Sequence, residues 1–264
     1  MIPCANGTDA LQIALMALDL QEGDEIITAD FTFAATVEVI HLLKLKSVLV
    51  DVDYDAFTIS TEAIKKAIAP RTKAIIPVHI FGQCANMEEI LKIAEEKNLY
   101  VIEDNAQAIG ADYTFADGTV KKSGTMSTVG TTSFFPSKNL GCYGDGGAIF
   151  TNNDELAHRL RGIVNHGMYE RYYHDEVGVN SRLDSIQAAV LRKKLPHLDS
   201  YNEARRKAAD FYDEAFAGHE HILTPKRAED STHVFHQYTL RILNGKRNEL
   251  QKFLTEKEIP AMIY

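Results

Sequence analysis

In Ser133-Phe134-Phe135-Pro136-Ser137-Lys138-Asn139-Leu140-Gly141, a buried strand runs into a turn that carries a lysine. Residues 131–135 are predicted to form that strand, and Pro136 ends it because proline has no N–H to donate to a neighbouring strand. Burial in a pocket wall lowers the pKa of a lysine and makes its amine nucleophilic. A single loop lysine is more often simply solvated. Four other stretches of the sequence favour the first interpretation for Lys138.

The composition is that of a globular protein with a sizeable core. The chain has 264 residues, of which 45% are hydrophobic and 25% are charged. Its net charge of −9 argues against a nucleic-acid or anionic-membrane partner, so an anionic substrate needs a local positive site. The three cysteines form no CxxC pair, and no segment is typical of a membrane span or a leader. We therefore expect a cytoplasmic protein that binds no metal.

Strands and helices alternate along the first two thirds of the chain. Helices are predicted over residues 8–20, 33–46, 61–69, 87–98 and 153–165, and strands over 25–29, 47–52, 73–79, 99–103 and 147–151. A polar, glycine-containing excursion between Tyr113 and Met126 is typical of a hairpin. The near-continuous apolar strands predict an α/β fold with a mainly parallel, doubly wound sheet and helices on both faces. In such sheets, ligands gather at the carboxyl ends of the strands.

The rest of the chain is predicted to begin a second, smaller α+β domain. A helix over 184–195 is expected to break at Pro196, and an amphipathic helix follows over 197–217. A half-exposed strand over 235–243 and a helix over 246–258 complete the pattern. We therefore expect a large domain over residues 1–195 and the start of the smaller one over 196–264. The abrupt first and last residues suggest a chain shortened at both ends.

Two further stretches offer partners for a phosphate and for a cation. Asn6-Gly7-Thr8-Asp9 opens a helix, where free N–H groups, a glycine and a hydroxyl suit an anion, although an ordinary helix cap looks the same. Asp104 stands at the end of a buried strand, where a carboxylate is costly unless a cation or donor pairs with it. A protonated pyridine nitrogen is such a cation, and capping of the next helix is the alternative.

Together these residues describe a pyridoxal phosphate pocket. Lys138 is predicted to form the Schiff base and, once released, to act as a general base. Asp104 is predicted to keep the pyridine nitrogen protonated, and Gly7, Thr8 and Ser133 to hold the phosphate. Phe33, which follows a strand, is predicted to stack on the ring, although core aromatics are commoner.

Five motifs stand in the order and spacing of one known family. They are Ala5-Asn6-Gly7-Thr8-Asp9-Ala10-Leu11, Asp30-Phe31-Thr32-Phe33-Ala34-Ala35-Thr36, Glu103-Asp104-Asn105-Ala106-Gln107, Ser133-Phe134-Phe135-Pro136-Ser137-Lys138, and Gly178-Val179-Asn180-Ser181-Arg182-Leu183-Asp184 with Gln187-Ala188-Ala189. Over nearly its whole length, the chain resembles the DegT/DnrJ/EryC1/StrS nucleotide-sugar aminotransferases, which are fold-type I pyridoxal phosphate enzymes.

The resemblance implies roles that the residues alone do not. Gln107 would contact the phenolic oxygen of the cofactor, Asn180 would reach the neighbour's cofactor phosphate across a homodimer, and Arg182 would lie near the sugar nucleotide. The sequence looks closest to members that aminate a 3-keto sugar, with glutamate as the expected donor. Candidate substrates are a UDP-2-acetamido-3-keto-glucuronate or a dTDP-3-keto-6-deoxyhexose, used for surface polysaccharide or glycan precursors.

Two alternatives to amino transfer stay open at this point. One is a dehydratase on the same cofactor, which Lys138 disfavours because the family members that dehydrate sugars have histidine at this position. The other is a catalytically silent fragment or scaffold. The complete set of cofactor residues argues against a catalytically silent protein, whereas a shortened chain would favour one.

Overall fold

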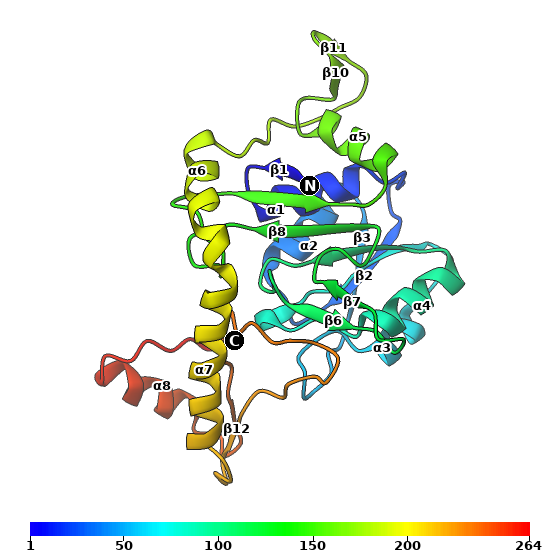
Figure 1. Ribbon diagram of the computed structural model, residues 1–264. Helices are drawn as coiled ribbons and strands as arrows, with labels where there is room; N and C mark the ends of the chain where they lie inside the picture. Colours follow the sequence, from blue (N-terminus) through cyan, green and yellow to red (C-terminus); the bar gives the residue numbers. More distant parts are fainter.

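The computed structural model describes residues 1–264 and contains one seven-stranded sheet in the order β1-β9-β8-β5-β4-β2-β3. The strands are β1 (Ile2–Cys4), β2 (Glu25–Ala29), β3 (Lys46–Val50), β4 (Thr72–Ile76), β5 (Tyr100–Asp104), β8 (Val129–Ser133) and β9 (Gly147–Phe150). Strands β3, β2, β4, β5 and β8 pair in parallel, and β9 pairs antiparallel with both of its neighbours, β8 and β1. The predicted mainly parallel sheet is confirmed (Figure 1).

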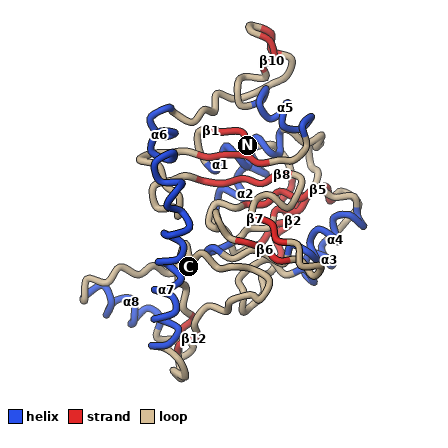
Figure 2. The backbone as a smooth tube through the Cα atoms, in the orientation of Figure 1, coloured by secondary structure: helices blue, strands red, loops and turns tan.

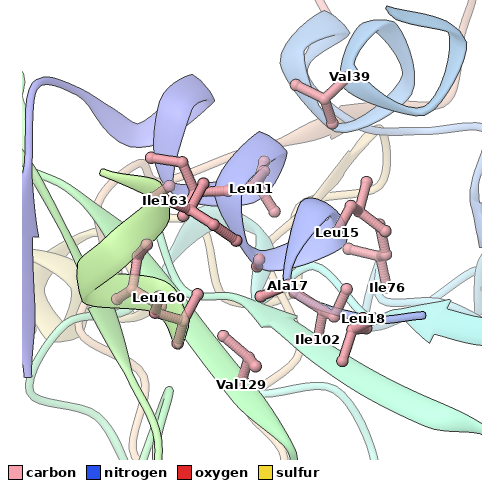
Figure 3. Close-up of a cluster of buried hydrophobic side chains, with 14 of the residues drawn as sticks. Leu11, Leu15, Ala17, Leu18, Val39, Ile76, Ile102, Val129, Leu160 and Ile163 are labelled. Atoms are coloured by element: carbon pink, nitrogen blue, oxygen red, sulfur yellow. The ribbon is translucent and has the colours of Figure 1, made fainter. Parts of the chain in front are cut away.

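Helices cover both faces of the sheet, because successive strand residues point to opposite sides. Ile26, Ile76 and Ile102 pack in one apolar cluster with helices α1 (Gly7–Met16), α2 (Ala34–Leu42) and α5 (Asp154–Ile163). Figure 3 shows Ile76 and Ile102 in this cluster beside Leu11 and Leu15 of α1. Ile27 and Ile75, each adjacent in sequence to one of these, belong to a second cluster with α3 (Thr61–Ala67) and α4 (Met87–Lys97). The sheet is therefore buried on both faces, which confirms the doubly wound arrangement.

Local signals place some helix ends correctly and others only approximately. Asn86 accepts a hydrogen bond from the N–H of Glu89 and caps α4, as its position predicts. The predicted helix over 33–46 is too long, because Lys44 takes a left-handed backbone with φ 58° and the chain turns there. Lys46 then joins β3 instead of extending α2. The helix predicted over 8–20 likewise ends early, at Met16.

The predicted hairpin is present, and the predicted helix break at Pro196 is only partial. Strands β6 (Asp112–Thr114) and β7 (Val120–Lys122) pair antiparallel. Helix α6 (Ser185–Lys194) passes through the 3-10 turn η2 (Leu195–His197) into α7 (Leu198–Ala215), and Figure 1 shows them as one column along the side of the sheet. Pro196 is tolerated because the first turn of a helix needs no N–H from it. The domain division at this point stays a prediction.

The strand predicted over 235–243 is wrong for most of its length. Only β13 (Arg241–Ile242) is extended, and it pairs with β12 (Ile222–Leu223). Phe235 takes a positive φ of 44°, which removes it from any strand. The preceding residue, Val234, donates its N–H to the backbone oxygen of Gly82 at 2.8 Å, in the 3-10 turn η1 (Ile80–Gly82). This segment therefore packs on the turn that follows β4.

Two peripheral elements complete the chain. The hairpin of β10 (Met168–Glu170) and β11 (Tyr173–His174) projects from one end of the molecule (Figure 2). Helix α8 (Arg247–Glu256) confirms the last predicted helix. None of the helices combines the length and the apolar character that crossing a membrane requires.

Candidate active site

Lys138 lies in a tight turn just beyond the carboxyl end of β8. Its backbone N–H donates to the backbone oxygen of Phe135 at 2.8 Å, which closes the turn around Pro136. The side chain is half-buried, and its amino group makes no hydrogen bond or ion pair with the rest of the chain. Burial lowers the pKa of Lys138 below its ordinary value, and the nearby Asp104 carboxylate partly opposes this. The structure therefore brings these two predicted residues together.

Asp104 ends β5, the strand that pairs with β8, and the residue is only 5% exposed. The hydroxyl of Thr36 donates to Oδ2 at 2.9 Å, and the N–H of Ala106 donates to Oδ1 at 3.1 Å. No ion pair is formed by this carboxylate within the chain. A buried carboxylate without a cation is costly, so the residue fits a ligand that brings a positive charge, such as a pyridinium nitrogen. The alternative role as a helix cap does not apply, because a turn follows it.

The amino end of α1 abuts the carboxyl end of β8. Asn6 caps the helix by accepting from the N–H of Asp9 at 2.8 Å, so the N–H groups of Gly7 and Thr8 have no acceptor within the helix. A Cβ atom at Gly7 would lie 2.7 Å from Cβ of Ser133, which shows how closely the two segments approach. Ser133 Oγ accepts from the N–H of Phe135 at 3.3 Å and keeps its proton for another acceptor. This arrangement suits a phosphate group.

Gly7→Ala is expected to weaken cofactor binding by at least about tenfold, because moving either segment costs contacts worth about 1–2 kcal/mol or more. The added methyl would clash with Ser133 and push the helix away from the strand. Fluorescence titration of the apoprotein with pyridoxal phosphate measures the change. Gly118→Ala controls for the substitution itself: its Cβ would meet no atom within 4 Å, so this variant is expected to keep the wild-type affinity even though its φ of +84° strains an alanine and lowers stability. Equal affinity of the Gly7 variant and the wild type would contradict this role for the close approach.

The other predicted residues differ in how they are held: one makes a hydrogen bond, and three are exposed. Gln107 Oε1 accepts from the backbone N–H of Phe81 at 2.6 Å, which leaves its NH₂ group to donate elsewhere. Phe33 is 70% exposed and precedes α2, whose Thr36 contacts Asp104. Asn180 and Arg182 are both exposed. Ser181 between them is buried and hydrogen-bonds Asp9 and the N–H of Ala5, so this loop lies against the start of α1.

Sequence reasoning missed two buried groups beside the site. One is Thr36, for which the only sequence signal is its spacing of four from Thr32. The other is Glu103, which accepts from Nε2 of His79 at 3.0 Å and from the N–H groups of Gly124, Met126 and Ser127. Burial alone would raise the pKa of Glu103, but these hydrogen bonds lower it overall. Nothing local in the sequence predicts that pair, because Glu103 lies in β5 and His79 follows β4, 24 positions away.

This set of residues combines a lysine amine, a buried carboxylate without a cation, and an anion site at a helix end. Those are the groups that hold the aldehyde carbon, the ring nitrogen and the phosphate of pyridoxal phosphate. No cluster of three or more histidine, cysteine or acidic side chains is arranged to hold a metal ion. Fold and site together define an α/β enzyme of the aminotransferase class.

The chain belongs to the DegT/DnrJ/EryC1/StrS aminotransferase family, whose model matches residues 1–264. It is 50% identical over 265 residues to a pleiotropic regulatory protein of Geobacillus stearothermophilus, covering all of this chain and 69% of the relative. It is 48% identical over 263 residues to UDP-2-acetamido-2-deoxy-3-oxo-D-glucuronate aminotransferase of Pseudomonas aeruginosa, with coverage of 100% and 71%. The chain thus spans about seven tenths of these two relatives.

Solved structures show the same fold. A DegT/DnrJ/EryC1/StrS aminotransferase from Brucella abortus superposes with a TM-score of 0.93 at 42% identity, over all of this chain and 70% of that one. NtdA from Bacillus subtilis, solved with bound cofactor PMP, gives a TM-score of 0.88 at 32% identity, with coverage of 98% and 58%. These matches confirm the predicted family and fold type.

Proposed function

We propose that the protein transfers an amino group from glutamate to the 3-keto carbon of a nucleotide sugar, with pyridoxal phosphate as cofactor. A UDP-2-acetamido-3-keto-glucuronate is the favoured substrate, and a dTDP-3-keto-6-deoxyhexose is the second. The observation that carries the proposal is the approach of a half-buried Lys138 amine, which makes no hydrogen bond, to a buried Asp104 carboxylate that forms no ion pair. The 48% identical relative that acts on the UDP sugar supports the choice of substrate.

The residues divide the chemistry between them. Pyridoxal phosphate, when bound, supplies an electron sink for the carbon that carries the amino group. Asp104 would hold the proton on the ring nitrogen, and its hydrogen bonds from Thr36 and Ala106 fix the carboxylate in place. Lys138, with its pKa lowered by burial, is partly neutral at a lower pH than a surface lysine and can take up and return a proton. Gly7, Thr8 and Ser133 would bind the phosphate, and Gln107 would donate to the phenolic oxygen.

The direct test is amino transfer with a defined donor and acceptor. Incubation with glutamate labelled at nitrogen and the UDP-3-keto sugar is expected to give 2-oxoglutarate and a labelled 3-amino sugar in equal amounts. The dTDP sugar, offered in parallel, measures the preference between substrates. A dehydrated sugar without label would favour the dehydratase alternative, and no product from either sugar would favour the silent scaffold. Lys138 argues against the dehydratase, and the complete set of cofactor residues argues against the scaffold.

We propose that two chains form a homodimer in which Asn180 of each completes the phosphate site of the other. Asn180 is exposed, and its loop is anchored to α1 through buried Ser181, so its side chain is available to a second copy. The apolar side chains of Phe135 and Ile186 are exposed in the single chain, which is consistent with a surface that a second copy covers.

Mixing two inactive variants tests that shared site. Lys138→Ala and Asn180→Ala are each expected to lose activity, the second through weaker cofactor retention. A refolded equimolar mixture is expected to recover about a quarter of wild-type activity, since half of the dimers are mixed and each has one complete site. No recovery, with mixed dimers shown to form, would place Asn180 in its own subunit's site.

We further propose a cytoplasmic enzyme that supplies glycan or polysaccharide precursors. All three cysteines are free and buried, which is consistent with a reducing compartment. Sugar nucleotides as substrates support the biosynthetic role. Activity that survives in a reducing buffer and is absent from a membrane fraction would agree with this placement.

A further inference from the structure

A chain of hydrogen bonds between buried amide groups joins the two sides of the candidate active site. Asn202, on α7, is 1% exposed, and its Nδ2 donates to the backbone oxygen of Ile109 at 3.2 Å. Its Oδ1 accepts from Nδ2 of Asn139 at 2.8 Å. The same Nδ2 of Asn139 donates to the backbone oxygen of Val234 at 2.9 Å. Three separate parts of the chain therefore meet at the Asn139–Asn202 pair.

Both ends of this chain of bonds lie next to groups that the chemistry needs. Asn139 directly follows Lys138 in the turn after β8. Ile109 lies in the turn after β5, which also carries Gln107 and begins at Asp104. The two turns follow the neighbouring strands β5 and β8, and Ile109 also packs against the apolar cluster that contains Phe134 and Leu140. Asn202 adds a hydrogen-bonded connection between the two turns.

The surroundings of Asn202 leave it little freedom. Gly110 has a φ of +88°, and a Cβ atom there would lie 2.7 Å from Nδ2 of Asn202. Oδ1 of Asn139 is buried and has no hydrogen-bond partner, so its amide nitrogen alone holds this side chain. Arg205, one turn further along α7, donates from its guanidinium to the backbone oxygens of Phe235 and His236 at 2.9 and 3.2 Å. Helix α7 thus binds residues 234–236, the segment that also accepts a hydrogen bond from Asn139 in the Lys138 turn.

We propose that Asn202 is a positioning residue, which acts through Asn139 on Lys138 and through Ile109 on the Asp104–Gln107 turn. Helix α7 thereby determines how the lysine amine is presented to the cofactor. This role rests on the proposed function, because it takes Lys138 as the amine that captures pyridoxal phosphate. A misplacement of about 1 Å can slow a reaction of positioned groups by roughly a hundredfold, so loss of the hydrogen bonds of Asn202 is expected to have a measurable effect.

The test measures how fast Lys138 of the full-length apoprotein captures pyridoxal phosphate. Samples are trapped with borohydride at set times, and the adduct on Lys138 is quantified by peptide mapping, which needs no sugar substrate. Asn202→Leu, which keeps the volume but makes neither hydrogen bond, is expected to capture the cofactor at least about tenfold more slowly. Asn139→Ala and Asn202→Ala are expected to slow capture by similar factors, and the double variant by no more than either alone.

The control separates positioning from loss of stability. Ala209 is buried on α7 and has no polar contact with the site, so Ala209→Gly is expected to lower the melting temperature while leaving the capture rate unchanged. If Asn202→Leu does not fold, Asn202→Ser, which is small and polar, replaces it with the same expectation. A wild-type capture rate in a folded Asn202 variant would overturn the role of Asn202. Absence of the Lys138 adduct in the wild type would instead overturn the proposed function.

Discussion

Lys138→Ala is expected to abolish turnover while the protein stays folded. The variant loses the nucleophile and the proton carrier together, and the loss of a general base alone costs about a hundred- to ten-thousand-fold. The fold should survive because the lysine amino group has no hydrogen bond or ion pair and its side chain is only half-buried. We therefore expect a melting temperature of the apoprotein within about 3 °C of the wild type, as for a change of no more than about 1 kcal/mol.

Two measurements decide the outcome for Lys138. Turnover of labelled glutamate and keto sugar gives the activity, and a melting curve without cofactor gives the stability. Lys97→Ala, at an exposed lysine in the last turn of α4, is the matched control and is expected to retain full activity. Unchanged turnover in the Lys138 variant would remove the central residue from the mechanism. A much lower melting temperature, or no cooperative transition, would mean that the role of Lys138 is structural.

Asp104→Asn is expected to keep the fold and to bind the cofactor, yet lose activity by about a hundredfold or more. The introduced amide has nearly the same volume but carries no charge, so the ring nitrogen is no longer held in its protonated form. Because this buried carboxylate forms no ion pair in the free chain, its replacement affects mainly one of its two hydrogen bonds, and the apoprotein should lose no more than about 1 kcal/mol of stability. The stabilisation gained on adding cofactor should become smaller, because the lost ion pair forms only in the complex.

Melting curves with and without pyridoxal phosphate, together with turnover, test this prediction. Glu103→Gln, at the adjacent carboxylate, provides the contrast: it accepts hydrogen bonds from His79 and several backbone N–H groups, so we expect lower stability even without cofactor. The pKa of Glu103 is lowered on folding, so its contribution to stability is complete near neutral pH and is lost as the pH falls through the acidic range. Full activity of Asp104→Asn would mean that another group partners the ring nitrogen.

The features predicted correctly are those with a local cause. Strand β2 has the predicted bounds, since its apolar run is flanked by turns, and α4 begins after the residue that caps it. The rule that ligands gather at the carboxyl ends of parallel strands predicts that Lys138 and Asp104 lie near each other, and the structure brings them close. That they and the other predicted residues hold a cofactor stays a prediction until a cofactor is observed.

The features that sequence reasoning missed depend on contacts between distant residues. Thr36 reaches Asp104 across 68 positions, and Asn139 reaches Asn202 across 63. The strand predicted after Val234 failed because Phe235 adopts a positive φ to fit against the turn at Gly82, which periodicity does not reveal. Helix α7 looked like a boundary element in the sequence, yet its buried face connects the two turns of the site.

The most direct test of the account is to locate the bound cofactor. Purified protein is mixed with pyridoxal phosphate, its visible absorption is recorded, and borohydride reduction is followed by peptide mapping. We expect a new absorption band and, after reduction, one major adduct on Lys138. An adduct spread over surface lysines, or concentrated on another residue, would contradict the proposed site.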